Sequence, residues 1–352
     1  LGVPLACSVA TQPLADVQQR VQLDLLVTGA DIVQASMDRD GVRLSCRDGR
    51  RFEAPMVIAA DGVHSVIARR LGLNPGWPAA SVAVDMMEEA PRTALRDIDP
   101  STLWVAYGFD SQRLGVGGRV RNSRASRGDR AAEGYAYIFP KRDHVNVGIG
   151  YVKQHFHEEV DAHPYELQRR FVDHLRGRGL MEGESSRRHF TPFIIPVGGP
   201  LKRPGEGRVL LAGDAGGFVN GFTAEGIYYA MVSGELAARA VIATQHTAWE
   251  GVAKRYAQAC DAEMGRELRE SVLIQRTLFA DRRRIARIIG GVPSEPVLTR
   301  TLLDFAMGKV SYAMVRRRLL MRAPLFALRL VSEYVRGLFQ PPAGSMGTAG
   351  DS

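Results

Sequence analysis

The chain has 352 residues with a net charge of +8, and its 45% apolar and 24% charged residues are ordinary for a globular protein of one large or two intertwined domains. No uncharged apolar run reaches the roughly 20 residues of a membrane-spanning helix, so we predict no transmembrane segment. Cys7, Cys46 and Cys260 are too far apart for a disulfide framework or a zinc-binding spacing, and we expect a cytoplasmic protein in a reducing compartment.

The first segments with a clear secondary-structure pattern predict a hairpin, a buried strand and a short helix. In "GVRLSCRDGRRFEA" apolar residues alternate with polar ones on both sides of Asp48–Gly49, which predicts a β-hairpin. "MVIAADG" is a continuous apolar run, which predicts a strand buried on both faces and ending at Asp61–Gly62. A short helix is predicted from Ser65, its N-cap, to Leu71.

Residues 77–196 read as a mostly antiparallel sheet interrupted by one helix. The strand-like runs are "ASVAVDM", "TLWVAYGF", "RLGVGGRV", "GYAYIFP" and "HVNVGIGY". The helix is predicted to open at His163–Pro164, to close at Gly177 or Gly179, and to bury one face made of Leu167, Phe171, Val172 and Leu175. The polar stretch "HFHEE" is read as a solvated loop, and we predict no metal site there.

The last third is predicted to be helical after one more strand. "RVLLAGD" predicts a buried strand, and a helix follows from Glu225 to about Ala243. Beyond Trp249 the pattern is helical to near Phe339, with breaks at prolines 293, 296 and 324. The tail, residues 341–352, is predicted to be disordered.

The positive charge is concentrated in this last third. Residues 281–340 hold 12 Lys and Arg against 4 Asp and Glu, whereas the rest of the chain holds 34 of each sign. In "SYAMVRRRLLMRAPLFALRLVSEYVRGLF" arginines mix with large apolar residues, which suits helices on an anionic membrane surface and equally suits core-facing helices with a basic rim. A nucleic-acid partner is disfavoured because the charge sits among leucines.

The stretch "VLLAGDAGGFVNGFTAEGIYYAM" carries the clearest chemical signal. It places Asp214 at the carboxyl end of a buried strand, where open α/β sheets bind ligands. A carboxylate there can accept hydrogen bonds from ligand hydroxyls, and the glycines around it let a ligand approach the backbone. The start of the following helix favours negative charge, so hydroxyls beside a developing anion, as in a reduced flavin, would fit. Asp214 as a plain helix N-cap is the alternative.

The same stretch, extended to "LLAGDAGGFVNGFTAEGIYYAMVSGELAA", resembles the flavin-contacting segment of the geranylgeranyl reductase family, which has a p-hydroxybenzoate-hydroxylase-like fold. "VIAADGVHSVIARRLGL" resembles the Asp-Gly segment near the FAD pyrophosphate. "YAYIFPK" resembles the family's Tyr-x-Trp-x-Phe-Pro motif, and "SYAMVRRRLLMRAP" resembles its C-terminal pattern. The resemblance covers nearly the whole chain.

Three departures from the family pattern stand out. Tyr137 replaces the usual Trp, Ala132 replaces a usual Pro, and no G-x-G-x-x-G fingerprint for the ADP half of FAD occurs. The first residues, from Leu1, resemble positions about a hundred along a full-length member. We therefore expect an N-terminally truncated chain.

The resemblance implies an α/β (α+β) fold with an FAD-binding Rossmann-like domain that lacks its N-terminal βαβ unit. The expected divisions are 1–75 and 197–246 for the FAD-binding domain, 76–196 for an antiparallel-sheet substrate domain, 247–340 for a helical C-terminal region and 341–352 for the tail.

The resemblance also assigns roles to individual residues. The cofactor FAD would be bound by Asp61, Gly62, Gly213, Asp214, Ala215, Gly226 and Ile227. The substrate would be bound by Tyr135, Tyr137, Phe139 and Pro140, which would wall an apolar cavity. The alternatives are a plain turn for Asp61–Gly62 and a place in the core for the three aromatic residues. No proton donor is assigned, and a tyrosine and a residue of the missing N-terminal segment both stay open for this role.

The implied activity is an FAD-dependent reduction of isoprenoid double bonds, with hydride passing from reduced flavin to the prenyl chain of a lipid, pigment or quinone. The alternatives are a flavin monooxygenase or halogenase on the same scaffold, and a non-catalytic, membrane-associated prenyl-lipid carrier. NADPH, ferredoxin and quinol-linked electron donors all stay open, as do the oligomeric state and peripheral membrane contact.

Overall fold

The computed structural model describes residues 27–106, 134–160, 162–244 and 249–279, with short stretches at 297, 300–301, 310–315, 317–318 and 321. The chain divides into two compact units, Leu1–Gly290 and Gly291–Ser352. Most described residues of the second unit are helical, and all that follows concerns the first unit.

The predicted hairpin forms two strands of a small antiparallel sheet with the order β1-β2-β3. These strands are β1 (Ile32–Met37), β2 (Val42–Cys46) and β3 (Arg51–Ala54). Gly49 has φ of +90°, a left-handed conformation that glycine adopts without steric cost, so the expected turn at Asp48–Gly49 is confirmed. The apolar side of β2 faces helix α2 (Val66–Arg70) and strand β11.

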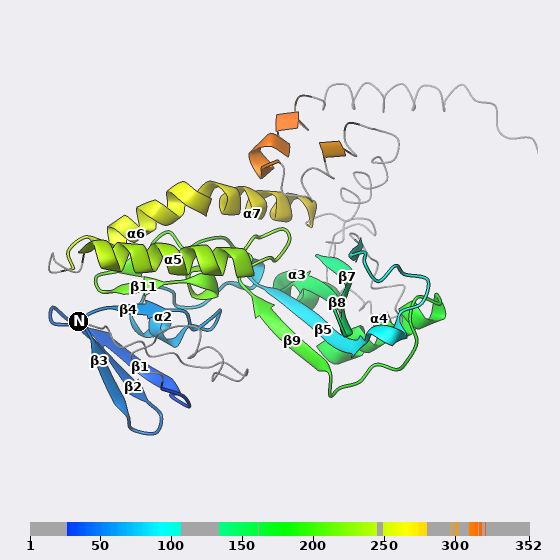
Figure 1. Ribbon diagram of the computed structural model, residues 1–352, viewed down its shortest axis with the longest axis horizontal. Coiled ribbons are helices and arrows are strands. Elements are labelled where there is room, and N and C mark those ends of the chain that lie inside the picture. The colour runs from blue at the N-terminus through cyan, green and yellow to red at the C-terminus, as the bar shows by residue number, and fades with distance from the viewer. Residues whose placement is uncertain are drawn as a thin grey trace, which may run out of the picture. The chain divides into compact units, whose positions relative to one another are not determined.

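A second small sheet, with the order β10-β11-β4, lies at the centre of the layers (Figure 1). Its strands are β4 (Val57–Ala59), β10 (Gly205–Glu206) and β11 (Val209–Leu211), and β11 runs parallel to β4. All three residues of β11 have no exposed surface. Leu210 packs against the helices on one side, whereas Val209 and Leu211 pack against the hairpin and α2 on the other, as the apolar run predicted.

One expectation for this sheet is wrong. β4 was expected to be buried on both faces, but Ile58 keeps 38% of its surface exposed. The reason is position, because β4 is an edge strand among the described residues and only its Ala59 side faces the packed cluster. After it, Ser65 caps α2 as predicted, since its Oγ accepts the N–H of Ala68 at 2.9 Å.

The largest sheet is antiparallel, with the order β6-β7-β8-β5-β9, which confirms a mixed fold with a mostly antiparallel sheet. Its strands are β5 (Ala83–Pro91), β6 (Trp104–Ala106), β7 (Tyr135–Pro140), β8 (His144–Val152) and β9 (Phe190–Ile195). The short 3₁₀ helices η1 (Ala79–Ser81) and η2 (Arg92–Ala94) flank β5. The expected strand in "RLGVGGRV" and the polar loop after it lie outside the described residues.

One face of this sheet is covered by helices α3 (Lys153–Glu159) and α4 (Pro164–Gly177). α4 begins after His163 and buries the four predicted apolar residues, so that prediction is confirmed. "HFHEE" is wrong as a loop, because it lies within α3, where Phe156 is anchored in the sheet's core at 7% exposure. Within the described ranges, no three His, Cys, Asp or Glu side chains gather as a metal site would need.

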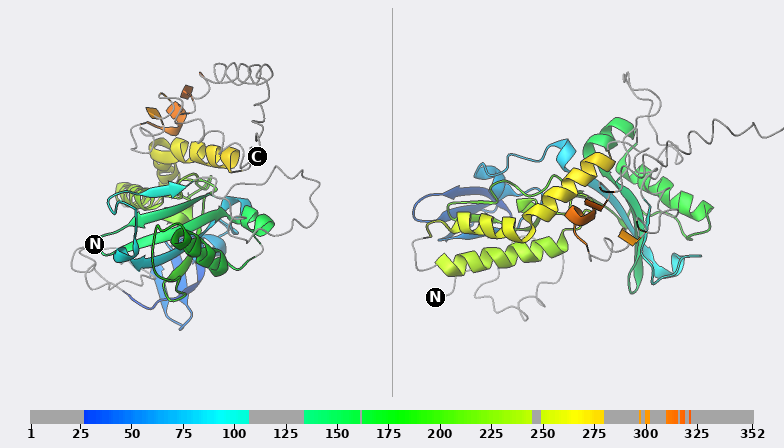
Figure 2. Two further views of the ribbon diagram at one scale, coloured as in Figure 1. Left: turned by 90° about the vertical axis from the view of Figure 1, so that its right-hand side faces the viewer. Right: turned by 90° about the horizontal axis from the view of Figure 1, so that it is seen from above.

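Helices cover the other side of β11. α5 (Ile227–Thr244) follows the Asp214 stretch, and α6 (Val252–Cys260), the π-helical segment η5 (Asp261–Gly265) and α7 (Arg266–Leu278) form one unbroken rod (Figure 2). The Tyr256 hydroxyl donates to the Leu211 carbonyl at 2.7 Å and so fastens the rod to β11.

The expected helices are confirmed as far as residue 278, whereas most of the basic C-terminal segment and the whole tail lie outside the described residues. None of the helices in the described part of the chain combines the length and the apolar character needed to cross a bilayer.

Candidate active site

Asp214 lies just after β11, in the 3₁₀ turn η4 (Gly213–Gly216). Its carboxyl group is partly buried, and burial raises its pKa above the ordinary value. Within the described residues no donor is bonded to this carboxyl group. A Cβ on Gly226, the residue before α5, would stand 3.5 Å from its Oδ1. The structure thus places Asp214 and Gly226 side by side, with acceptor capacity that the described protein does not use.

The glycines of this stretch have packing roles. Gly213 has φ of +57°, its N–H donates to Ser233 Oγ at 2.9 Å, and its missing Cβ lets Ala230 of α5 come close. A Cβ on Gly217 would stand 2.5 Å from the Gly199 carbonyl oxygen. Protein atoms therefore occupy the space that we expected these glycines to leave for a ligand. Ala215 is 1% exposed and belongs to the core beside α2.

The loop from residue 220 to residue 226 connects η4 to α5 and is closed by Asn220. The Asn220 side-chain oxygen accepts the N–H groups of Phe222 and Thr223, each at 3.0 Å. Its backbone N–H donates to the Glu225 carbonyl, and its carbonyl accepts from Ala224, each at 2.9 Å. Ala224 is held at φ of +57°, a conformation that alanine rarely adopts and that recurs at functional sites.

The start of α5 is open on one side. Ile227 is 78% exposed and points away from the packed core. The Glu225 carboxylate accepts the N–H of Tyr228 at 2.9 Å, so one of the amides at the helix start is bonded within the chain.

A cavity of about 160 Å³ lies where the loop meets the uncovered face of the large sheet. The hydroxyl of Tyr135 donates to the Thr223 carbonyl at 2.5 Å and ties the sheet to the loop. The lining residues come from four strands, the loop and the α7 end of the rod. They are Ala83, Asp85, Gly134, Tyr135, Tyr137, Phe139, Asn146, Gly150, Tyr151, Val152, Ile195, Val197, Gly221, Phe222, Ala224, Gln275 and Phe279.

The three aromatic side chains of β7 stand on the cavity face. They alternate with Ala136 and Ile138, which are fully buried in the core on the other face. The rings of Tyr137 and Phe139 stack at 4.5 Å between centroids, and Tyr135 lies 5.9 Å from Tyr137. The strand ends at Pro140, which is outside the cavity lining.

An unexpected acid lies in this cavity. Asp85 of β5 accepts a hydrogen bond from the Tyr137 hydroxyl at 2.9 Å. Burial raises the pKa of Asp85 to about 6, and the bond from Tyr137 offsets part of that effect. Burial and the neighbouring carboxylate raise the pKa of Tyr137 as well. Sequence reasoning missed Asp85, because an acid in an alternating strand has the same pattern when it faces water.

Two glycines of β8 make room for this pair. Tyr137 lies opposite Gly148 in the strand register, and Asp85 lies opposite Gly150. A Cβ on Gly148 would overlap the Tyr137 ring, so the phenol can extend across β8 toward β5 only because residue 148 is glycine. A Cβ on Gly150 would meet nothing closer than 3.8 Å.

The cavity is more polar than the sequence implied. Asn146 Oδ1 and Gln275 Oε1 are buried, and neither oxygen has a hydrogen-bond donor in the described structure. Both residues line the cavity together with Asp85. Buried acceptors without donors are rare in proteins, so this end of the cavity is suited to hold water or a ligand hydroxyl.

Asp61 and Gly62 follow β4 and therefore lie at the same edge of the sheet as Asp214. Asp61 Oδ2 accepts the N–H groups of Val66 and Ile67, at 2.8 and 3.2 Å, so this acid caps α2. Asp61 Oδ1 is buried, and no donor in the described residues reaches it. Gly62 has φ of +76°, and no described atom lies within 4 Å of the place of its Cβ.

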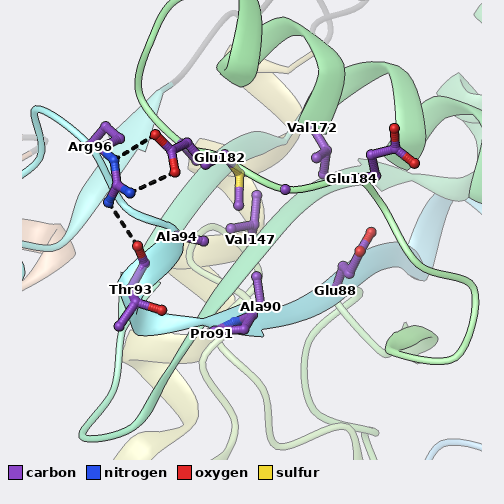
Figure 3. Close-up of a pocket in the computed structure, with 12 residues that line it drawn as sticks. Glu88, Ala90, Pro91, Thr93, Ala94, Arg96, Val147, Val172, Glu182 and Glu184 are labelled. Carbon is purple, nitrogen blue, oxygen red and sulfur yellow. Dashed lines mark hydrogen bonds and ion pairs between the residues drawn. The ribbon is translucent and has the colours of Figure 1, made fainter.

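A second cavity, of about 330 Å³, lies on the opposite face of the large sheet (Figure 3). Three of its four charged groups, Glu88, Arg96 and Glu182, already have protein partners. Arg96 forms two hydrogen bonds to Glu182, at 2.9 and 2.6 Å, and Glu88 accepts from Ser185 and Ser186. This cavity is separated by the sheet from the Asp214 stretch, and we regard the smaller cavity as the candidate site.

We compared the chain with known proteins by sequence and by structure. No family model matches the chain. Digeranylgeranylglycerophospholipid reductase 2 of Methanothermobacter thermautotrophicus is 32% identical over 228 residues, which are 60% of this chain and 51% of that protein. The chloroplastic geranylgeranyl diphosphate reductase of Oryza sativa subsp. japonica is 29% identical over 194 residues, 55% of this chain and 35% of that protein.

Other relatives carry different names. Protein FixC of Bradyrhizobium diazoefficiens is 29% identical over 206 residues, 57% of this chain and 43% of that protein. The chain thus spans about half, or less, of the length of these curated relatives.

Among solved structures, a geranylgeranyl bacteriochlorophyll reductase-like protein of Thermoplasma acidophilum matches with a TM-score of 0.58 at 18% identity, over 75% of this chain and 62% of that chain. A likeness at this identity shows a shared fold alone. A flavin-dependent halogenase matches 73% of this chain and 43% of that chain with 17% identity and a TM-score of 0.48, too low to bear on function.

The raised pKa of Asp85 predicts a pH-dependent stability. The folded protein holds this proton up to a pH of about 6, whereas the unfolded chain releases it near 4. The free energy of unfolding therefore falls by up to about 3 kcal/mol as the pH rises from about 4 to 6. In urea unfolding, the wild type should lose this stability as the pH rises, whereas Asp85→Asn should not. The control Asp40→Asn, which changes an exposed acid, should lose as much as the wild type. A parallel pH dependence in wild type and Asp85→Asn would contradict the assignment.

The two strand glycines predict a matched contrast. Gly148→Ala forces Tyr137 out of its place, and we expect a loss of roughly 1–3 kcal/mol, as for overpacked cores. Gly150→Ala, on the same face of the same strand, should change stability by less than about 1 kcal/mol, because its Cβ meets only ordinary contacts. Urea unfolding of both variants tests the contrast, and equal losses would show that Tyr137 is not seated over Gly148.

Proposed function

Since this chain is a relative of the geranylgeranyl reductases among the FAD-dependent oxidoreductases, we propose that it forms the catalytic part of an FAD-dependent reductase of isoprenoid double bonds. The observation that supports this most is the position of Asp214. Its carboxyl group, which no donor among the described residues reaches, lies beside Gly226, and the loop from 220 to 226 leads from there directly to an aromatic-walled cavity.

The residues present fit the flavin and ribityl half of FAD. A partly buried carboxyl group without a donor suits the hydroxyls of a ribityl chain, and Asp214 would bind them. The backbone around Gly226 and Ile227 would border the flavin ring. Asp61 Oδ1, which is buried and reached by no donor in the described part of the chain, and the space beside Gly62 that described atoms leave open would lie toward the pyrophosphate.

The adenine half needs residues beyond the described ones. The printed sequence holds no G-x-G-x-x-G, and the chain covers only part of its relatives. We therefore propose that 1–75 and 197–246 belong to an FAD-binding domain interleaved with a substrate domain at 76–196. When bound, the flavin supplies a hydride for an alkene, which no amino-acid side chain can supply.

The cavity would receive the reacting part of the prenyl chain. The stacked rings of Tyr137 and Phe139 offer dispersion contacts along an apolar chain. At about 160 Å³ the cavity is smaller than most ligand pockets, so it would enclose the double bond under attack rather than a whole geranylgeranyl group. The polar end would face a hydroxyl or a water molecule.

The partners of the reaction stay predictions. NADPH, ferredoxin and quinol-linked donors are all compatible with the described site. Peripheral contact of the basic segment 281–340 with a membrane also stays a prediction. The monooxygenase or halogenase alternative would be favoured by oxygen consumption coupled to a hydroxylated or halogenated product.

The test of the function is a visible spectrum of the protein expressed from its full coding sequence. Flavin absorption bands should bleach on anaerobic reduction and return when geranylgeranyl diphosphate is added without oxygen. Mass spectrometry should then show a product heavier by two hydrogens for each bond reduced. A protein that stays colourless after incubation with FAD would rule out the flavoenzyme and favour the non-catalytic lipid carrier.

Asp214→Ala should weaken FAD binding by roughly ten- to a hundredfold, because hydrogen bonds to a charged acceptor are lost. Asp214→Asn keeps an acceptor and should lose less. Fluorescence titration of FAD into the flavin-free protein measures both affinities, with the exposed Asp40→Ala as the control. An unchanged affinity in Asp214→Ala would remove Asp214 from the flavin site.

A further inference from the structure

We propose that Asp85 is the proton donor of this site and that the Tyr137 hydroxyl passes the proton to the substrate. The inference rests on the proposed function, because an alkene that receives a hydride at one carbon needs a proton at the other. The sequence and its family resemblance left a tyrosine and a residue of the missing segment open for this task and named no specific residue. The geometry of the cavity supplies one.

Both groups line the cavity, and they are already bonded to each other. The Tyr137 hydroxyl lies 2.9 Å from Asp85 Oδ2. Phe222 and Ala224, from the loop that leads to Asp214, line the same cavity. A prenyl chain in this cavity would therefore contact the acid pair and the loop that we assign to the flavin.

Asp85 has the acidity for the task. The titratable groups in the described lining are Asp85, Tyr135, Tyr137 and Tyr151, and no described Lys, Arg or His lines the cavity. Without a cation to stabilise the carboxylate, burial raises the pKa of Asp85 to about 6, so part of the protein carries the proton near neutral pH. The pKa of Tyr137 is also raised, so its hydroxyl keeps its proton and serves as a relay.

The transfer balances. With flavin bound, one alkene carbon would gain a hydride from the reduced flavin, the two-electron donor, and the other carbon would gain the proton of the Tyr137 hydroxyl. The protonated Asp85 carboxyl group would donate its O–H to the phenol oxygen, the reverse of the bond between Tyr137 and the carboxylate, and its proton would replace the one that leaves. The carbon–carbon π bond is lost, two carbon–hydrogen bonds form, and the flavin is oxidised. The Asp85 carboxylate that remains takes a proton from solvent before the next turnover.

The position of the Tyr137 side chain depends on the two neighbouring strands. Its phenol crosses β8 where glycine stands at position 148, and it reaches an acid on the next strand. A tyrosine that only filled a core would not need a carboxylate beside its hydroxyl, since burying a charge near an apolar face is costly. The pair lowers stability above pH 6, and function is a reason for a protein to carry such a pair.

The first measurement needs no turnover. Infrared difference spectra between pH 4 and 8, on protein labelled with ¹³C at aspartate carboxyl groups, follow protonated carboxyls directly. We expect one aspartate to titrate near pH 6, to vanish in Asp85→Asn, and to titrate higher in Tyr137→Phe because the bond that favours the carboxylate is gone. If the signal near pH 6 survives in Asp85→Asn, the assignment is overturned.

The second measurement is a single turnover with geranylgeranyl diphosphate, using anaerobically reduced protein from the full coding sequence. The wild-type rate should fall about tenfold per pH unit above the pKa of Asp85. Asp85→Asn should be slower by on the order of a hundredfold or more and lose this pH profile, whereas Asp85→Glu should regain part of the rate. Tyr137→Phe should be slowed while its pH dependence moves upward.

Two controls separate the outcomes. Reoxidation of the reduced flavin by ferricyanide needs no proton at carbon and should be equal in all variants, which excludes loss of folding or of flavin. A wild type that reduces the prenyl compound, beside an Asp85→Asn variant with the same rate and pH profile, would overturn the inference alone. A flavin-loaded wild type that leaves the compound unreduced would overturn the proposed function and the inference with it.

Discussion

The site depends on the closure of one loop by one residue. Asn220 engages its side-chain oxygen, its amide and its carbonyl in hydrogen bonds to residues 222 to 225, and the loop therefore has a fixed shape despite its two glycines. One end of the loop sets Gly226 beside Asp214, and its middle forms part of the cavity wall. The Tyr135 hydroxyl joins this loop to the large sheet. A short polar network thus shapes the loop and ties it to the large sheet.

The central sheet explains why two acids stand at the edge of an otherwise apolar core. β11 is buried on both faces, so a polar side chain that could face a ligand can only follow the last residue of the strand. Asp61 follows the neighbouring parallel strand, and one of its carboxylate oxygens caps α2. Neither carboxylate oxygen of Asp214 is hydrogen-bonded within the described part of the protein. Position in the sheet is the same for both acids, and their partners distinguish a mainly structural carboxylate from one available to a ligand.

Periodicity predicted most elements, because a strand or helix that buries one face must repeat its apolar residues. The hairpin and α4 follow that rule, whereas β11 is buried on both faces and is marked by a continuous apolar run. β9 has no such alternation, so periodicity does not predict it, and α3 has a single anchoring residue, Phe156, so its sequence gives no helical period. Asp85 could not be found this way, since its partner Tyr137 is 52 residues distant and meets it only through strand pairing across the β8 glycines. Local patterns carry the elements, but a site built across strands depends on register.

In the rod of α6, η5 and α7, every fourth residue from Val252 to Leu268 is buried. In a pure α-helix each such step turns the buried stripe by about 40°, so the stripe would wind toward solvent over this length. The π-helical segment η5 has a wider turn and takes out part of that rotation. The rod can therefore rest on β11 at Tyr256 and still present Gln275 to the cavity, almost three turns beyond the segment. The number of residues between 261 and 265 sets the angular phase of α7, and a deletion there would turn Gln275 and Phe279 away from the cavity without changing any residue that lines it.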